Sequence, residues 1–264
     1  MPELAEVEYY RKQWDPGLGA RVTAIRTNPK ARDFRECDAS ALARSLKGAT
    51  LRESLTHGKQ MVFKFSGGRW LGVHLGMAGK LECRKTGADR EKHDHLVLVQ
   101  KGRELVFNDY RMFGVIRFHE GKGAPDWWSD LPPEVTDKAF TKKRVADFLE
   151  RRGKSPVKAI LLDQSMFPGI GNWMADEILW QIGIFPGRRG ANLTKQESDA
   201  IWKTTRTISR HALKTIGVDW RDPPKSWLFK HRWRDGNACP RCVADLRRDE
   251  IGGRTTCWCP GCQT

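Results

Sequence analysis

The sequence lacks several features that would define other classes of protein. No apolar run approaches the roughly 18 residues that a membrane-spanning helix needs. Residues 1–6 carry acidic side chains and no apolar core of the kind found in secretory signals. There is no internal repeat and no low-complexity tract. We therefore expect a chain that is neither secreted nor bound to a membrane.

Negative charge is also in deficit. The 47 basic residues outnumber 32 acidic ones, which gives a net charge of +15 and an isoelectric point near 9.7. The basic residues are spread along the whole chain rather than gathered on one amphipathic helix, and 11 tryptophans and 11 phenylalanines accompany them. A solvated basic surface is the simplest interpretation, but this combination favours a nucleic-acid partner over a membrane surface.

The first half of the chain mixes helix and strand patterns. Apolar residues recur near the helical period over 3–14, and a second helix fits 41–47, with Asp38 or Ser40 as its N-cap and Gly48 as its stop. Between 50 and 118 the pattern becomes one of short β-rich runs separated by glycine-containing turns: 61–65, 70–75, 96–99, 105–107 and 115–118. This pattern predicts an antiparallel sandwich or barrel.

The second half is predicted to be helical. Residues 121–135 are rich in glycine and proline, as linkers are, and helical patterns follow at 141–151, 156–163, 173–182 and 195–216. Thr194 and Glu197 have capping-box spacing. The predicted fold class is α+β and multidomain. The predicted parts are an N-terminal β-sandwich flanked by helices (1–122), a linker (123–135), a helical domain (136–222) and a C-terminal zinc module (223–264).

Four of the seven cysteines have the spacing of a metal site. They form two Cys-x-x-Cys pairs, Cys239 with Cys242 and Cys259 with Cys262. Without a secretory signal, this pattern favours one Zn²⁺ held by four thiolates over disulfides. Four thiolates leave no open coordination position, so we expect a structural zinc. Cys257 is an extra thiol that could compete as a ligand, whereas Cys37 and Cys83 fit the role of small buried apolar residues.

Two further segments are candidate phosphate sites. Residues 169–172 (GIGN) precede the predicted helix at 173, with Asn172 as a suitable N-cap and free N–H groups at the helix start. An ordinary turn between helices explains the same residues. Arg254 follows two glycines between the cysteine pairs. One interpretation is that its guanidinium contacts phosphate, and the other is that it points into solvent.

The residue after the initiator methionine suggests covalent chemistry. If Met1 is removed, Pro2 has a terminal secondary amine, and an α-amino group titrates about two units below a lysine. Its condensation with a sugar C1′ gives an iminium that cannot lose an N–H proton, which makes it a strong electron sink. Glu3 could transfer protons beside it. The alternative is that both residues merely begin a helix.

Taken together, these motifs resemble one family. Residues 2–8 (PELAEVE), 57–59 (HGK), 74–77 (HLGM), 92–95 (KHDH), 169–172 (GIGN) and the cysteine hairpin are similar, in this order, to the formamidopyrimidine-DNA glycosylase/endonuclease VIII family. The likeness spans nearly the whole chain and is closer to the formamidopyrimidine branch.

The resemblance implies a β-sandwich, a helix–two-turns–helix domain and a zinc finger, in a bifunctional glycosylase and AP lyase of base excision repair. Pro2 would attack C1′ of the damaged nucleotide, expel the base and nick the strand by β,δ-elimination. Glu3 would be the acid acting at the sugar, Glu6 a supporting carboxylate, and Lys59 would reach the lesion and its phosphate. The partner would be damaged double-stranded DNA, and the protein a monomer.

The resemblance also assigns DNA-binding residues. Asn172 and Arg254 would clamp phosphates beside the flipped nucleotide. Met77, Arg111 and Phe113 match the positions that fill the gap left in the duplex. The full DNA-binding set is His74, Met77, His93, Arg111, Phe113, Asn172 and Arg254. Such a protein would be cytoplasmic and associated with the nucleoid in a bacterium, or nuclear in a eukaryote.

The sequence departs from the family pattern at three places, of which the third, the segment that would cover the flipped base, affects the expected substrate. Ala5 replaces a common proline, Met112 replaces a basic residue, and residues 217–238 are short and lack the Gly-Gly-Thr-Thr run of members that cut 8-oxoguanine. We therefore expect weak activity on 8-oxoguanine. Hydantoins, formamidopyrimidines and oxidised pyrimidines are alternative lesions. A non-catalytic damaged-DNA binder is the alternative class, favoured if Met1 is retained. A zinc-containing RNA-binding protein would leave the N-terminal motif unexplained.

Overall fold

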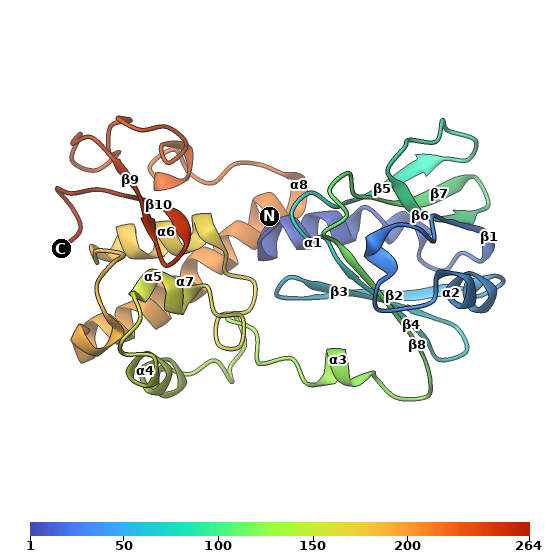
Figure 1. Cartoon of the computed structure of the whole chain (residues 1–264), viewed down its shortest axis with the longest axis horizontal. Helices are drawn as coiled ribbons and strands as arrows, with labels where there is room; N and C mark the ends of the chain where they lie inside the picture. Colours follow the sequence, from blue (N-terminus) through green and yellow to red (C-terminus); the bar gives the residue numbers. More distant parts are fainter. The chain divides into compact units, whose positions relative to one another are not determined.

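The computed structural model describes residues 1–264, which divide into two compact units (Figure 1). The β unit comprises residues 1–2 and 6–131, and the helical unit comprises residues 3–5 and 132–264. The boundary near 131 lies within the glycine- and proline-rich segment, where Asp126–Ser129 form one helical turn, α3. The cysteine-rich segment belongs to the same compact unit as the helices.

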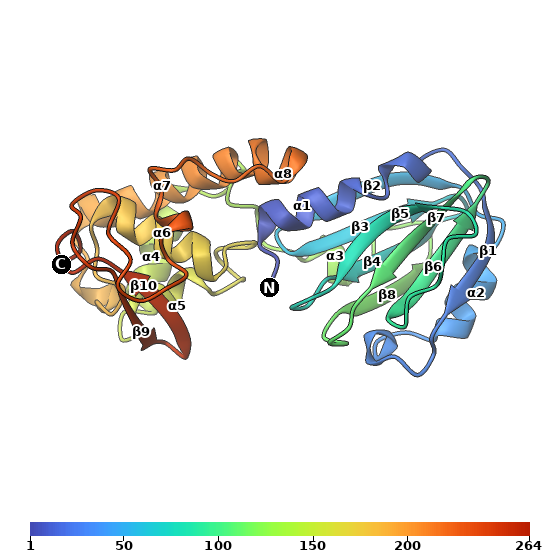
Figure 2. The same ribbon diagram turned by 90° about the horizontal axis from the view of Figure 1, so that it is seen from above.

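The β unit contains two four-stranded antiparallel sheets (Figure 2). Their strand orders are β1-β6-β7-β5 and β2-β3-β4-β8. The strands are β1 Val22–Thr27, β2 Leu51–His57, β3 Gln60–Phe65, β4 Arg69–His74, β5 Lys80–Lys85, β6 Asp94–Gln100, β7 Arg103–Asn108 and β8 Val115–Glu120. Of the two architectures left open by the sequence, the structure is a sandwich.

A tryptophan connects the two sheets. The Trp14 ring packs on Phe63 of β3 with ring centroids 4.6 Å apart, and its indole N–H donates to the carbonyl of Val106 in β7 at 3.2 Å. Apolar side chains from both sheets and from the flanking helices share this core. Burying such large side chains supplies the main stabilisation of the unit.

Helices flank the sandwich. They are α1 (Leu4–Lys12), η1 (Asp15–Gly17), η2 (Arg32–Phe34) and α2 (Ala39–Leu46). The Asp38 carboxylate accepts the N–H groups of Ser40 and Ala41, so Asp38 and not Ser40 is the N-cap of α2. α1 ends two residues before the predicted limit, and Trp14 packs into the core beyond it.

Three strands did not give a recognisable pattern in the sequence: β1, β2 and β5. Each carries charged side chains on a partly exposed face, as in Leu51–His57, and β1, β2 and β5 lie at sheet edges. Hydrophobic alternation is weak in such strands because one face and one edge are solvated.

The helical unit is built on a long amphipathic helix and four shorter ones. These are α4 (Lys142–Arg151), α5 (Val157–Leu161), α6 (Asn172–Ile182), α7 (Lys195–Lys214) and α8 (Ile216–Asp219), with the short turns η3 (Gly190–Asn192) and η4 (Leu228–Lys230). Their apolar faces form a second core, to which Leu4 and Ala5 also contribute. None of the helices is long and apolar enough to cross a membrane.

The predicted capping box of α7 is confirmed. The Thr194 hydroxyl accepts the N–H of Glu197 at 3.2 Å, and the Glu197 carboxylate accepts the N–H of Thr194 at 2.7 Å. The helix stops at Lys214, before the predicted residue 216, because Thr215 adopts φ −113° and ψ −86°. A separate short helix, α8, follows this break.

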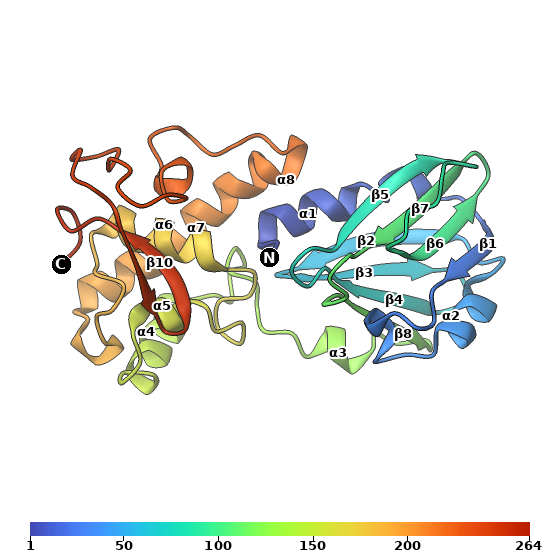
Figure 3. The same ribbon diagram turned by 45° about the horizontal axis from the view of Figure 1, so that its top comes forward.

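The C-terminal segment forms a β-hairpin beside α6 (Figure 3). β9 (Arg247–Ile251) pairs antiparallel with β10 (Arg254–Trp258). The two residues that connect them, Gly252 and Gly253, have φ of 61° and 72°. Glycine adopts this left-handed conformation without steric cost, which accounts for the Gly-Gly pair at the tip.

Candidate functional site

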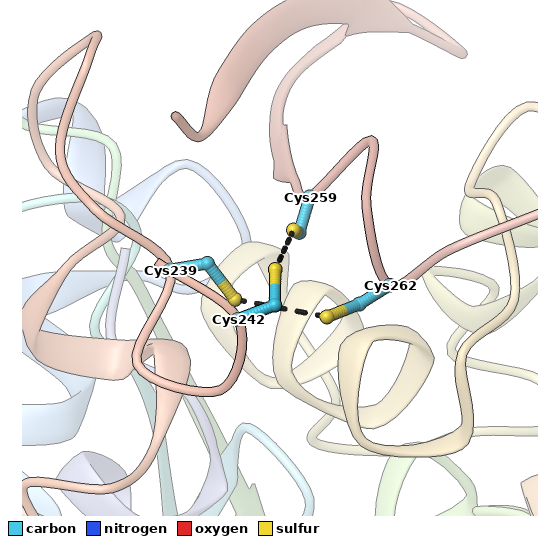
Figure 4. A group of neighbouring side chains, drawn as sticks. All are labelled: Cys239, Cys242, Cys259 and Cys262. Atoms are coloured by element: carbon cyan, nitrogen blue, oxygen red, sulfur yellow. Dashed lines mark hydrogen bonds between the residues drawn. The ribbon is translucent and has the colours of Figure 1, made fainter. Parts of the chain in front are cut away.

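The two Cys-x-x-Cys pairs converge on one point (Figure 4). All four sulfur atoms lie within 4.8 Å of one another; Cys242 and Cys259 are 3.4 Å apart, and Cys239 and Cys262 are 3.9 Å apart. A tetrahedral Zn²⁺ with Zn–S bonds of about 2.3 Å places its sulfurs about 3.8 Å apart. The donor set and spacing therefore fit one four-thiolate metal ion.

The remaining cysteine of the module lies outside this cluster. Cys257 is buried in β10, and burial, together with the charge of Asp176, raises the pKa of its thiol to about 12. The sequence left Cys257 open as a competing ligand, and the structure keeps its sulfur out of the cluster. By contrast, the pKa of Cys239 falls to about 7: burial raises it, but N–H groups that include the Trp180 indole donate to its sulfur and stabilise the thiolate.

Glu3 is the residue that the helical unit holds most tightly near the N-terminus. Its side chain is 2% exposed and reaches the start of α6. It accepts the N–H of Gly171 at 2.8 Å, of Trp173 at 2.8 Å and of Met174 at 3.2 Å. The N–H of Leu4 also donates to the carbonyl of Gly169 at 3.0 Å. A carboxylate that accepts three donors at the positive end of a helix is strongly favoured in its charged form.

This arrangement corrects the prediction for the glycine turn. Asn172 is the first residue of α6 and Gly171 is the N-cap, so Asn172 does not cap the helix. The N–H groups of Gly171, Trp173 and Met174 are bonded to Glu3 and are not free for a phosphate. Gly171 is needed for a second reason: a Cβ there would lie 2.4 Å from the Glu3 carboxyl carbon. The close approach of Glu3 therefore explains the glycine.

Asn172 connects α6 to the hairpin instead. Its side-chain amide donates to the carbonyl of Thr255 in β10 at 2.8 Å, while its Oδ1 is buried without a hydrogen-bond partner. Arg254, the residue before Thr255, is exposed at the base of the Gly-Gly turn. The predicted phosphate-contacting pair, Asn172 and Arg254, is thus brought to neighbouring positions within the helical unit.

A buried charge network supports the same junction. Lys158 in α5 and Asp176 in α6 are fully buried and paired, and Lys158 also donates to the carbonyl of Asn172 at 2.7 Å. The second oxygen of Asp176 accepts Arg232 at 2.5 Å and the N–H of Cys257 at 3.1 Å. Removing one partner would leave a buried charge uncompensated, which costs about 3–5 kcal/mol.

Sequence reasoning missed this network. A charged residue on the buried face of the apolar helix, in the run Trp173-Met174-Ala175-Asp176, was the available signal. The partners of Asp176, which are Lys158 and Arg232, lie far from it in the sequence, so no local pattern predicts them.

Two loops at one end of the sandwich carry the predicted gap-filling residues. Met77 follows β4, and Arg111 and Phe113 lie in residues 109–114 between β7 and β8, here called the wedge loop. Met77 is 40% exposed and Phe113 is 43% exposed, which is unusual for such apolar side chains and is not a core role. A Cβ at Gly76 would lie 2.4 Å from the Phe113 backbone, so the two loops are in direct contact.

The wedge loop has a defined conformation. The Arg111 guanidinium lies 5.0 Å from the centre of the Phe113 ring, and Met112 has a positive φ of 53°. A side chain in this region costs about 1–2 kcal/mol, so surrounding contacts must hold the loop.

Lys59 and the predicted histidines lie at loop and strand ends of the β unit. Lys59 occupies the tight turn between β2 and β3. His74, at the end of β4, accepts the N–H of Gly76 at 3.1 Å; burial and then the charge of Lys59 lower its pKa to about 4. His74 is therefore neutral near pH 7. His93 is half-buried, and its carbonyl accepts the N–H of Asp109 at 3.1 Å, which ties it to the wedge loop.

The N-terminal residues differ in their surroundings. Met1 is 54% exposed and Pro2 is half-buried. Pro2 is peptide-bonded to Glu3, whose side chain is fixed by α6, and Glu6 lies in the first turn of α1. Four hydrogen bonds fix the chain directly after Pro2: three N–H groups donate to the Glu3 carboxylate, and the N–H of Leu4 donates to the carbonyl of Gly169.

The segment 217–238 folds back onto the helical unit. Trp227 and Phe229 pack against its core, and Phe229 stands edge-on to Trp173 with centroids 4.8 Å apart. Trp220 and Trp233, however, are 45% and 55% exposed. Trp233 nevertheless stands edge-on to Phe229, with ring centroids 5.9 Å apart.

Comparisons with known proteins agree with the architecture. The sequence model of the formamidopyrimidine-DNA glycosylase N-terminal domain matches residues 1–116, and that of the formamidopyrimidine-DNA glycosylase H2TH domain matches residues 131–222. A β-sandwich, an H2TH domain and a four-cysteine hairpin together define a protein of the DNA glycosylase class.

Individual relatives show which family of DNA glycosylases the chain resembles. Formamidopyrimidine-DNA glycosylases of Carboxydothermus hydrogenoformans and of a Roseiflexus species are each 32% identical, over the full length of both chains. A solved complex of the Lactococcus lactis protein with DNA that contains an abasic site is 27% identical, with a TM-score of 0.90 over 99% of each chain. A complex of MutM with DNA carrying carbocyclic 8-oxo-G is 26% identical, with a TM-score of 0.89 over the full length of both. The chain belongs to the formamidopyrimidine-DNA glycosylase family.

Proposed function

We propose that this chain excises oxidised or ring-opened bases from double-stranded DNA and nicks the strand, with the Pro2 amine as nucleophile. Membership of the family makes it a base excision repair glycosylase with AP lyase activity. The observation that supports this role for Pro2 is the fixation of Glu3. The residue after the nucleophile is bonded to three N–H groups of α6, the same helix that presents Asn172.

Pro2 and Glu3 would share the bond-forming and proton-transfer steps. The nitrogen lone pair of Pro2 bonds to C1′, and the glycosidic bond breaks with its electrons going to the base, which takes up a proton. Glu3, a carboxylate in the structure, receives the proton that the amine sheds and delivers it to the sugar oxygen as the ring opens. The resulting iminium draws electrons from C2′ and promotes elimination of the 3′ and then the 5′ phosphate.

Other residues would bind and orient the DNA. Asn172 and Arg254 contact phosphates from the helical unit, and Lys59 reaches the lesion and its phosphate from the β unit. Met77, Arg111 and Phe113 fill the space vacated by the flipped nucleotide, because an empty site in the stack costs a few kcal/mol. His74 and His93 line the same end of the sandwich, and Glu6 supports the reacting end of α1.

The metal that we propose for the cysteine cluster is one structural Zn²⁺. When bound, it cross-links the chain around the hairpin and supplies no open position for catalysis. The four sulfurs, the Trp180 indole and the Asp176 network then hold Arg254 and Thr255 beside Asn172.

Borohydride trapping with abasic-site DNA tests the nucleophile. Protein with a free Pro2 amine should form a covalent complex, and the same protein carrying an N-terminal extension should form none until the extension is removed. A non-catalytic damaged-DNA binder would bind the duplex in both forms and be trapped in neither. Equal trapping of the extended and the processed protein would show that another amine is the nucleophile.

The proposed lesion preference excludes efficient action on 8-oxoguanine. Distinguishing it from guanine requires a closed pocket whose polar groups are left unpaired by the wrong base. In residues 217–238, Pro223 and Pro224 lack N–H donors, while Trp227 and Phe229 are committed to the helical core. Lesions that are ring-opened or already poorly stacked need less recognition because they are easier to flip.

A further inference from the structure

Three buried polar side chains lie in or next to the wedge loop, and none has a part in the proposed chemistry. Asp33 in η2 and Asp109 at the start of the loop are both 0% exposed, and His95 in β6 is 2% exposed. Buried ionisable groups are costly unless they are paired, so their arrangement requires an explanation.

Asp109 holds the loop directly. Its Oδ1 accepts the N–H of Arg111 at 3.1 Å, and its Oδ2 accepts the N–H of Gly114 at 2.7 Å. The carbonyl of Gly114 in turn accepts the Arg35 guanidinium at 2.6 Å. These bonds close the loop at both ends, and they are the contacts of an ionised carboxylate.

Asp33 has the opposite character. Neither of its carboxyl oxygens accepts an N–H or O–H donor, although both are buried. Its carboxyl group faces that of Asp109: a Cβ built on Gly114 would lie 2.7 Å from Asp33 Oδ1 and 3.1 Å from Asp109 Oδ2. Two carboxylates cannot both keep their charge at such a position, so one retains its proton.

The groups around the pair decide which carboxyl is protonated. Burial first, and then the charge of Asp109, raises the pKa of Asp33 to about 7, and the Arg35 charge opposes this in part. His95 lies 3.8 Å from Asp33 Oδ2, and burial lowers the pKa of its imidazole. The carbonyl and the charge of Asp109, and then the charge of Asp94, oppose this in part, and the neighbouring His93 ring acts in the same direction as burial.

The contacts of His95 fit a neutral ring. Its Nε2 donates to the carbonyl of Asp109 at 3.0 Å, and its Nδ1 lies 3.3 Å from the Asn28 amide, which donates to it. A neutral imidazole supplies no positive charge to offset a second carboxylate. Asp33 is thus the acid of the pair and Asp109 the carboxylate.

We propose that Asp33 and Asp109 are positioning residues: the carboxylic acid of Asp33 hydrogen-bonds the carboxylate of Asp109, and this pair holds Arg111 and Phe113 in the conformation that enters the duplex. The inference rests on the proposed function, because it assumes that the wedge loop enters DNA. When Asp33 loses its proton, the bond is replaced by repulsion between two buried charges. The loop then relaxes, since Met112 gains by leaving its left-handed conformation.

The test compares two abasic-site substrates as the pH rises from about 6 to about 8.5, on either side of the Asp33 pKa. Duplex DNA needs the wedge loop because a stacked nucleotide must be flipped, whereas single-stranded DNA does not. The ratio of borohydride trapping on the two substrates cancels the pH dependence of the Pro2 amine itself. In the wild type this ratio should fall by about three- to tenfold as the pH passes through about 7, the equivalent of one hydrogen bond lost.

Asp33→Asn provides the decisive variant. Its amide donates to Asp109 at every pH, so the ratio should stay high and flat. Asp38→Asn is the matched control: it makes the same change at an exposed N-cap five residues on, where asparagine caps equally well, and should keep the wild-type profile. A wild-type ratio that does not change with pH, or an Asp33→Asn ratio that falls as in the wild type, would overturn the proposal.

A second measurement needs no activity. Burial also raises the pKa of Glu177 to about 7, so the infrared carbonyl band of Asp33 is identified as the part of the wild-type band at pH 6 that Asp33→Asn lacks. That part should vanish as the pH rises through about 7, and its absence at pH 6 would also overturn the proposal. Absence of trapping on both substrates at every pH would refute the nucleophile assigned to Pro2, and the infrared band would still decide the protonation of Asp33.

Discussion

Replacement of Glu3 by glutamine should destabilise the helical unit in addition to impairing base excision. The change keeps the size of the side chain and removes its charge. In the structure, one carboxylate oxygen accepts the N–H of Trp173, and the other accepts those of Gly171 and Met174. A glutamine has one acceptor oxygen, and its NH₂ group must face at least one of these donors.

The magnitude follows from those three bonds. With the amide oxygen turned to Gly171 and Met174, the N–H of Trp173 is left buried without an acceptor, at a cost of about 1–3 kcal/mol. The two remaining bonds lose their charge assistance, which is about half the strength of each. The sum is about 3 kcal/mol, which for a unit of this size lowers Tm by about 6–12 °C.

Scanning calorimetry of the full chain measures this change, and Glu150→Gln is the matched control. Glu150 is an exposed residue of α4 in the same unit, and no other side chain pairs with it. The Tm of Glu150→Gln should therefore stay within about 1 °C of the wild-type Tm. Excision kinetics and duplex binding are measured alongside, and we expect Glu3→Gln to reduce excision more than binding.

The reasoning would be refuted if Glu3→Gln and Glu150→Gln unfolded at the same temperature. In that case the three N–H bonds contribute no net stability, and the fixation of the residue after Pro2 could not support its role. Loss of excision with an unchanged Tm would leave Glu3 a proton-transfer group only.

Three further predictions concern the metal, the phosphates and the lesion. Metal analysis should find about one zinc per chain, and Cys262→Ala should lose the metal and most duplex affinity; zinc-free protein that binds normally would contradict this. Arg254→Ala should weaken binding at every sequence and make the slope of log K against log salt shallower by about one unit, whereas an unchanged slope would show that Arg254 touches no phosphate. Single-turnover excision of 8-oxoguanine opposite cytosine should be slower than that of a hydantoin and slower than the nicking of an abasic site, and equal rates would show that another segment closes the base pocket.

Local patterns in the sequence predicted most of the secondary structure. The strands β3, β4, β6, β7 and β8 and the helices α2, α4, α5, α6 and α7 lie where alternation, helical periodicity and capping signals place them. These signals are local, because they depend on residues a few positions apart and on the capping and turn residues at each end. The edge strands β1, β2 and β5 were not predicted, because apolar and polar residues alternate only weakly in them.

The metal site is the clearest success of sequence reasoning. Two Cys-x-x-Cys turns contain the whole ligand set within a short segment, so spacing alone predicts the cluster that the structure contains. The exclusion of Cys257 could not be predicted, because β10 turns its side chain into the core beside Asp176 rather than toward the other sulfurs.

The sequence by itself determined the class of this protein: motifs in order along the chain, the basic charge and the two cysteine pairs were sufficient. Only the tertiary structure decided what each residue does locally. It placed Glu3 on the N–H groups that the sequence assigned to a phosphate, made Asn172 a link to Thr255 rather than a cap, and set Asp33 against Asp109. The physical reason is that a hydrogen bond or a pKa depends on partners distant in the chain, whereas periodicity and ligand spacing are properties of neighbours.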